Sequence, residues 1–64
     1  MIVHLRQPRR QIEIDGPSSV NALLDHLELG RESHLVIRNG TLVPGDGRLE
    51  VDDVIEIRPV VSGG

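Results

Sequence analysis

Side chains that could do chemistry are few in this chain of 64 residues. The histidines, His4, His26 and His34, have neither the spacing nor the companion cysteines of a metal site, so we interpret them as solvated side chains. Asp52 and Asp53 are adjacent carboxylates, but they precede a predicted strand, and we place them in a solvated turn. No metal site and no catalytic residue is therefore predicted.

The remaining reactive group is the carboxylate of Gly64, which follows Ser62 and Gly63 at the end of the sequence. An unperturbed terminal carboxyl group has a pKa of about 3.3–3.7, so Gly64 is expected to carry a carboxylate at neutral pH. A carboxylate is a poor electrophile, and chemistry here would need activation by another molecule. Because glycine has no Cβ, Gly63 and Gly64 suit passage through a narrow channel.

Composition excludes several other functions. The chain has no cysteine and no Phe, Tyr or Trp, and its formal net charge is −3. Thiol chemistry is therefore absent, and the lack of stacking groups and of excess positive charge argues against direct nucleic-acid binding. No apolar run approaches the roughly 20 residues of a membrane span. The sequence "GDGR" lacks the GK[ST] and helix of a phosphate loop, and the serines have no triad context. We expect a cytoplasmic protein that is monomeric when free.

Lysine is also missing, because all seven strongly basic residues are arginine. The N-terminus is then the only primary amine that the sequence offers. An activated carboxyl group on this chain could not be captured by a lysine of the same chain.

Alternating apolar and polar residues predict several strands. Residues 2–7, "IVHLRQ", and residues 11–15, "QIEID", alternate with a period of two, and the short "PRR" between them predicts a hairpin. The segment "HLVIRNGTLV" predicts a strand, a turn at Asn39 and Gly40, and a short extended piece. The segment "DDVIEIRPVV" predicts the last strand.

One amphipathic helix of about three turns is predicted between the first hairpin and the third strand. Its apolar residues recur at i, i+3, i+4 and i+7, namely Val20, Leu23, Leu24 and Leu27. A serine, either Ser18 or Ser19, can accept hydrogen bonds from the free N–H groups of the first turn, and Gly30 stands where a C-terminal cap belongs.

The whole chain resembles the small ubiquitin-like sulfur carriers, which include the thiazole-forming carrier (ThiS) and the small subunit of molybdopterin synthase (MoaD). The resemblance is carried by "SSVNALLDHLEL", "VIRNGTLVP", "VDDVIEI" and the terminal "PVVSGG". It implies an α+β fold of the β-grasp (ubiquitin-like) type, with a mixed sheet of four to five strands, one helix on one face and the last strand beside the first. We expect a domain over residues 1–58 and a flexible tail over residues 59–64.

The resemblance also implies a chemistry for Gly64. A ubiquitin-activating-type adenylyltransferase would use ATP to adenylate the carboxylate, and sulfur from a persulfide donor would then convert it to a thiocarboxylate. A sulfur-accepting synthase or thiolase would be the last partner, and the carrier itself would bind no cofactor and catalyse nothing. Residues 59–64 would span about 20 Å if extended, which is enough to enter a partner's active site.

Partner docking is expected on the outer face of the sheet. If Ile37, Ile55 and Ile57 face the helix, neighbouring residues of the same strands face outward. This reasoning, extended into the tail, predicts a docking surface made of Val36, Arg38, Glu56, Arg58, Val60 and Val61.

Two other functions remain open at this point. A protein modifier would join the same activated Gly64 to a lysine of a target, and a noncovalent β-grasp binding module would not need Gly63 or Gly64. The sulfur-accepting pathway also stays open between thiamine thiazole synthesis, molybdopterin synthesis, tRNA thiolation and other biosynthesis.

Overall fold

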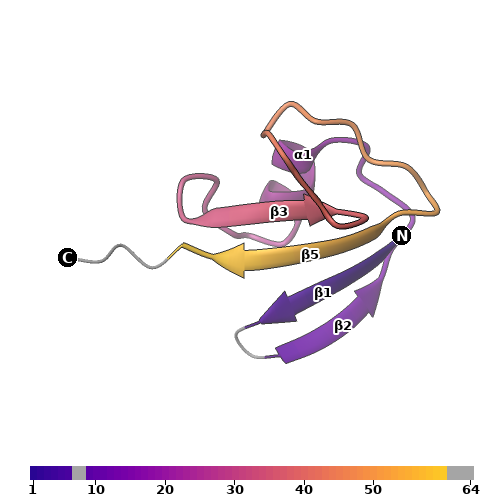
Figure 1. The fold of residues 1–64 in the computed structure, drawn as a ribbon, viewed down its shortest axis with the longest axis horizontal. Helices are drawn as coiled ribbons and strands as arrows, with labels where there is room; N and C mark the ends of the chain where they lie inside the picture. Colours follow the sequence, from indigo (N-terminus) through magenta and orange to yellow (C-terminus); the bar gives the residue numbers. More distant parts are fainter. Residues whose placement is uncertain (7–8, 61–64) are drawn as a thin grey trace.

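The computed structural model describes residues 1–6 and 9–60, and Figure 1 shows their path. The elements, in chain order, are β1 (Ile2–Arg6), β2 (Arg9–Glu13), α1 (Val20–His26), β3 (His34–Arg38), β4 (Thr41–Val43) and β5 (Val54–Pro59). The strands form one sheet in the order β2-β1-β5-β3-β4. Strands β1 and β5 are parallel, and the other neighbours are antiparallel. This mixed sheet with one helix is the β-grasp fold, so the predicted fold and the place of the last strand beside the first are confirmed.

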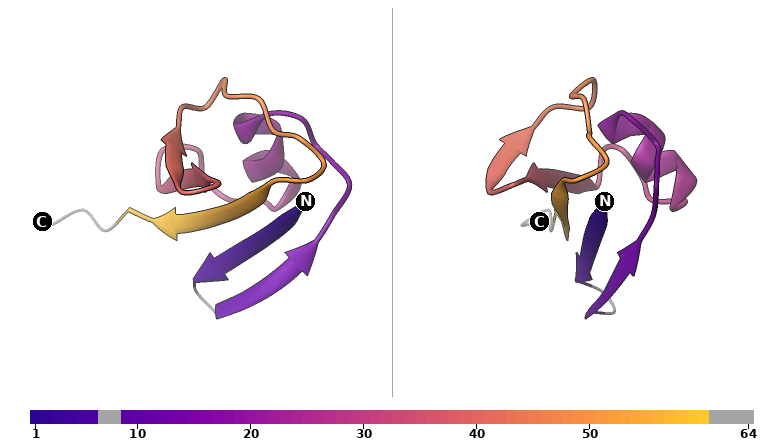
Figure 2. Two further views of the ribbon diagram at one scale, coloured as in Figure 1. Left: turned by 45° about the vertical axis from the view of Figure 1, so that its right-hand side comes forward. Right: turned by 90° about the vertical axis from the view of Figure 1, so that its right-hand side faces the viewer.

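The helix packs on one face of the sheet, as Figure 2 shows from two sides. Leu23 and Leu24 are 0% and 2% exposed and lie against the buried strand residues. Burying one such side chain stabilises the fold by about 1.5–3 kcal/mol. The buried core consists of Met1, Val3, Val20, Leu23, Leu24, Val36, Leu49, Ile55 and Ile57.

The start of α1 agrees with the sequence. Ser19 is the N-cap, and its Oγ accepts a hydrogen bond from the N–H of Ala22 at 3.3 Å. Of the two candidate serines, Ser19 therefore fills the role, which satisfies one of the free donors of the first turn.

The end of α1 differs from the prediction. The helix has seven residues, about two turns, and its cap does not use Gly30. Glu28 takes the left-handed conformation with φ of 59°. The N–H of Leu29 donates to the carbonyl of Leu24 at 2.8 Å, and the N–H of Glu28 donates to that of Asp25 at 3.0 Å. This is a Schellman motif with a glutamate at the position that usually holds glycine, so a search for glycine placed the end too late.

The turn between β3 and β4 was predicted correctly. Asn39 and Gly40 have φ of 49° and 87°, and they join the paired residues Arg38 and Thr41. A two-residue hairpin loop needs positive φ at both positions, which asparagine and glycine tolerate.

The last strand continues slightly beyond the predicted domain boundary. Pro59 belongs to β5 and pairs with His34 of β3, and the N–H of Val60 donates to the carbonyl of Ser33 at 2.8 Å. The first two residues of the predicted tail are thus attached to the sheet, while residues 61–64 lie outside the described part of the chain.

Candidate functional site

The predicted reactive residues follow the central strand of the sheet. Strand β5 lies between β1 and β3, and the last described residues, Pro59 and Val60, stand at one end of the sheet (Figure 1). We call this end of the molecule the tail root. Val60 is 44% exposed there. The predictions for Val61, Ser62, Gly63 and Gly64 fall outside the described residues, so their predicted roles stay predictions.

The hairpin of β1 and β2 also turns at the tail root, because β1 is parallel to β5. Glu56 lies on the outer face of β5 and accepts hydrogen bonds from two arginines. Arg6 Nη2 donates to Glu56 Oε2 at 3.0 Å, and Arg58 Nε donates to the same oxygen. These bonds, that from Arg58 first, lower the pKa of Glu56 below its ordinary value. The outward placement of Glu56 and Arg58 agrees with the sequence.

Val36 does not face outward, which corrects the predicted docking surface. It is 1% exposed and pairs directly with the buried Ile57. Residues that pair across a sheet share a face, so Val36 faces the helix and Ile37, which pairs with Glu56, faces outward. The error arose because three apolar residues in a row, Leu35 to Ile37, carry no alternation.

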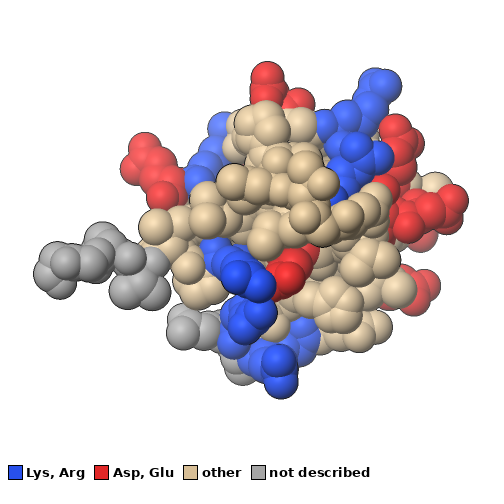
Figure 3. All heavy atoms as spheres, viewed as in Figure 1, with Lys and Arg blue, Asp and Glu red and all other residues tan. Residues whose placement is uncertain are grey.

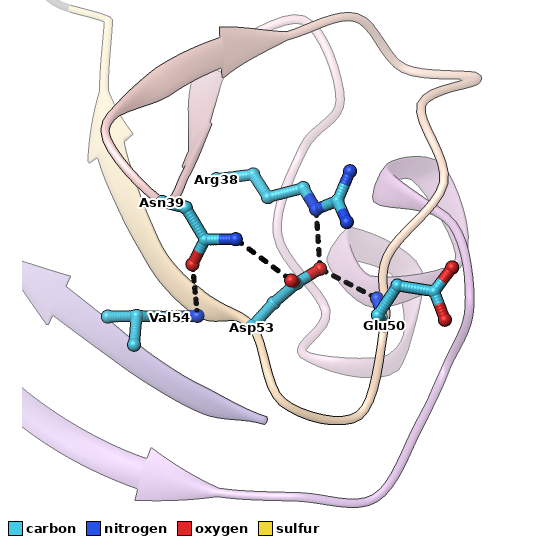
Figure 4. A network of polar contacts seen from close by, with 5 residues as sticks. All are labelled: Arg38, Asn39, Glu50, Asp53 and Val54. Carbon is cyan, nitrogen blue, oxygen red and sulfur yellow. Dashed lines mark hydrogen bonds and ion pairs between the residues drawn. The ribbon is translucent and has the colours of Figure 1, made fainter.

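Arg38 is also wrongly placed in the predicted docking surface. It pairs with Ile55, on the same face as the core, and its Nε donates to the buried carboxylate of Asp53 (Figure 4). The N–H of Glu50 and the Nδ2 of Asn39 also donate to Asp53, at 2.7 and 2.9 Å. We call these residues, with the N–H of Val54 that donates to Asn39 Oδ1, the Asp53 network.

The Asp53 network also corrects the interpretation of the two adjacent carboxylates. Asp52 is exposed, as expected, but Asp53 is 5% exposed rather than solvated. Hydrogen bonds, that from Arg38 first, lower the pKa of Asp53 to about 2. The network therefore holds an ionised carboxylate in place between the β3–β4 turn and the start of β5, and its role is structural.

Sequence reasoning missed the apolar part of the outer face. Leu35 is 45% exposed and Leu42 is 59% exposed. Ile37 lies on the same face, two residues after Leu35 in β3, and pairs with Leu42 of β4. We call Leu35, Ile37 and Leu42 the outer apolar strip. The pairing of β3 with β4 puts Ile37 opposite Leu42. Which face of β3 is exposed, however, depends on the packing of the core and not on β3 alone.

No group of three or more His, Cys, Asp or Glu side chains within residues 1–6 and 9–60 could hold a metal ion. His4 and His26 are exposed, and His34 is half-buried with its Nδ1 at 2.9 Å from the carbonyl oxygen of Gly30. No helix in the same part of the chain is long and apolar enough to cross a membrane.

A β-grasp domain whose last strand is the central one of the sheet defines the class of ubiquitin-like proteins. The family model described as "ThiS family" matches residues 3–64, so the chain belongs to the ThiS family. Members are small carriers rather than enzymes, and the family supports a sulfur-carrier or ubiquitin-like role in general. No individual curated protein matches the chain.

Proposed function

We propose that the chain is a sulfur carrier and that Gly64 carries the sulfur. Its carboxylate attacks the α-phosphorus of ATP on an activating enzyme, which forms an acyl adenylate and releases pyrophosphate. The terminal sulfur of a persulfide then attacks the acyl carbon and displaces AMP. A thiol reductant cleaves the resulting acyl disulfide and leaves the thiocarboxylate. The observation that carries this proposal is the family match, which continues from the folded domain through Gly64.

The position of β5 supports this chemistry. The described chain ends at Val60, on an exposed end of the sheet, and the four further residues would reach about 13 Å if extended. A partner could therefore take up the tail while the domain stays outside its active site. The thiocarboxylate would serve thiazole synthesis, molybdopterin synthesis or tRNA thiolation equally well, so the acceptor enzyme decides the pathway.

The outer face of the sheet supplies the docking surface in this proposal. Glu56, Arg58 and Val60 keep their predicted role, and the outer apolar strip replaces Val36 and Arg38. Exposed apolar patches of this kind mark interaction sites. We expect Leu42→Asp to weaken activation at least about tenfold, the cost of a charge desolvated at an interface. Val51→Asp is the matched control, because Val51 is 60% exposed, as much as Leu42, and lies outside the outer apolar strip.

The direct test is ATP–pyrophosphate exchange by the activating enzyme of the same organism. We expect exchange with the full chain and none with a chain that lacks Gly63 and Gly64, whereas both proteins should unfold at the same temperature. A truncated chain that keeps its biological function would contradict the proposal and favour a noncovalent binding module. Isopeptide adducts on target lysines would instead favour a protein modifier.

A further inference from the structure

A small hollow lies at the tail root, where the sheet extends beyond the end of the helix. Because α1 has only seven residues, the last part of the inner face is left partly open. The hollow encloses about 120 Å³. This is close to the roughly 150 Å³ of an apolar cavity that holds one benzene molecule, so the space suits a single large side chain.

The lining of the hollow combines apolar and basic groups. Its apolar part comes from β1, β5 and the segment after the helix, namely Leu5, Leu27, Leu29, Ile57 and Pro59. Its polar part consists of Arg6, Arg10 and His34, and none of its lining residues carries a carboxylate. The contact of His34 Nδ1 with the carbonyl oxygen of Gly30 holds the imidazole ring in position.

The arginines at the tail root exceed the carboxylates that pair with them. Glu56 is shared by Arg6 and Arg58, and within the described residues neither Arg9 nor Arg10 has an ion-pair partner. The chain as a whole carries a formal charge of −3. Positive charge is thus concentrated on the side of the β1–β2 hairpin, whereas Glu28 and Glu32 lie in the loop after α1 on the other side of the tail root.

The opposite end of the sheet has the opposite character. A surface around the N-terminus is lined by Glu13, Asp15, Asp52 and Asp53 and contains no basic side chain among its lining residues. In the view of Figure 3, basic side chains gather at the lower centre, and acidic ones lie on the right and also at the upper left. The hollow at the tail root and the surface around the N-terminus therefore differ in electrostatic potential.

We propose that the hollow receives an acidic side chain from the protein that takes up the tail. This inference rests on the proposed function, because a channel that admits the tail must lie against the tail root. The carboxylate would bind Arg10, which pairs with Leu5 and so shares the inner face of the sheet, and its methylene groups or an apolar neighbour would contact Leu27 and Leu29. Charge-assisted bonds from arginine to carboxylate are strong and directional.

The nucleotide itself is a poor occupant of the hollow. An extended tail would place the carboxylate of Gly64 about 13 Å from Val60, so ATP bound at that carboxylate would lie too far from the arginines. Nucleic acid is disfavoured by the net negative charge and by the absence of stacking side chains. An acidic loop at the mouth of the partner's channel fits both the position and the charge.

The test compares two peptides on the full, ¹⁵N-labelled chain. The probes are acetylated and amidated Glu-Leu-Glu-Glu-Leu-Glu and its glutamine counterpart Gln-Leu-Gln-Gln-Leu-Gln. We expect only the acidic peptide to shift the amide signals of Leu5, Leu29 and His34. Equal shifts with both peptides, or shifts confined to another surface, would overturn the proposal. Tighter binding of a short RNA at the same residues would overturn it in favour of a nucleic-acid surface.

Two arginine variants make the test specific. Arg10→Gln removes an arginine of the hollow, and Arg48→Gln removes an exposed arginine that also has no ion pair among the described residues but does not line the hollow. We expect the first to raise the Kd for the acidic peptide about tenfold and the second to change it less than about twofold. Self-association of Arg10→Gln with unchanged peptide binding would mean that Arg10 only protects the edge of β2.

The activating enzyme provides an independent readout. In ATP–pyrophosphate exchange, Arg10→Gln should raise the KM for the chain about tenfold with kcat unchanged, because docking weakens while the tail chemistry is intact. If the enzyme adenylates none of the proteins, the proposed function fails, and the peptide comparison still decides whether the hollow binds a carboxylate.

Discussion

The two ends of the sheet use arginine and carboxylate groups in opposite ways. In the Asp53 network, one carboxylate that is 5% exposed accepts three hydrogen bonds, one of them from Arg38. At the tail root, Glu56 pairs with Arg6 and Arg58, whose side chains are 47% and 50% exposed. Arg10 beside them has no ion pair within the described residues. The arginine and carboxylate groups are therefore hydrogen-bonded around a buried carboxylate at one end, and they are exposed and incompletely paired at the other.

This difference separates stability from recognition. An exposed ion pair contributes little to folding because water already solvates its charges. A buried carboxylate that loses its donors, or buried donors that lose their acceptor, cost the full desolvation of those groups. Substitutions in the Asp53 network should therefore change unfolding, and substitutions at the tail root should change binding.

The largest expected effect on stability comes from replacing one carboxylate at each end of the sheet by the matching amide. We expect Asp53→Asn to lower Tm by about 10 °C, because the amide leaves part of the donors of Arg38, Asn39 and Glu50 unpaired. Glu56→Gln should lower Tm by less than about 2 °C. Thermal unfolding followed by circular dichroism at neutral pH measures both. Similar losses in the two variants would remove the distinction between the ends.

The second effect concerns the two faces of β3 and tests the corrected register. Val36→Ala should cost about 2 kcal/mol of unfolding free energy, because Val36 is 1% exposed. Leu35→Ala should cost less than about 0.5 kcal/mol, since Leu35 is 45% exposed. Urea denaturation gives both values. The opposite ranking would restore the predicted outward position of Val36.

The third effect is a pH dependence of the unfolding free energy that comes from Asp53. The pKa of Asp53 is lowered from its ordinary 3.8 to about 2, chiefly by the hydrogen bond from Arg38. The stability that this carboxylate contributes is therefore complete above about pH 3.8 and is lost as the pH falls towards 2. Urea denaturation between about pH 5 and 2 should show a smaller loss of stability in Asp53→Asn than in the wild type. Parallel curves for the two proteins would show that Asp53 is not the source.

The smallest effect is a gain of stability near the tail root. Glu28 has φ of 59°, and glycine adopts this conformation without the steric cost of a Cβ. Glu28→Gly should raise the unfolding free energy by about 1 kcal/mol. Glu32→Gly, in the same loop but without a positive φ, should be neutral or slightly destabilising. An equal change in both variants would mean that charge, not the backbone, is responsible.

Two parts of the fold that depend only on neighbouring residues were predicted correctly from the sequence. The turn at Asn39 and Gly40 and the start of α1 at Ser19 followed from the residues that such positions require. The end of α1 did not, because Glu28 takes a position at which sequence reasoning expects glycine. The helix period and the strand period were sufficient for the kind and order of the elements but not for their bounds, since the second strand was expected over residues 11–15 and spans Arg9–Glu13. The strand order came only from resemblance to a family.

The site was less predictable because it depends on pairing between distant segments. Glu56 and Arg58 were placed outward correctly, since their strand alternates clearly. Val36 and Arg38 were placed wrongly, because the face of β3 is set by the pairing of Val36 with Ile57. The hollow at the tail root combines residues from five separate segments, namely β1, β2, the loop after α1, β3 and β5, so no single segment could reveal it.

The most direct test of the central claim is the mass of the C-terminal fragment. The protein would be recovered from its native cells, or incubated with ATP, a persulfide donor and its activating enzyme, and then fragmented. We expect one oxygen of Gly64 to be replaced by sulfur, a change that localisation to the C-terminal fragment distinguishes from oxidation of Met1. An unmodified Gly64 in the presence of a demonstrably active enzyme would contradict the carrier function.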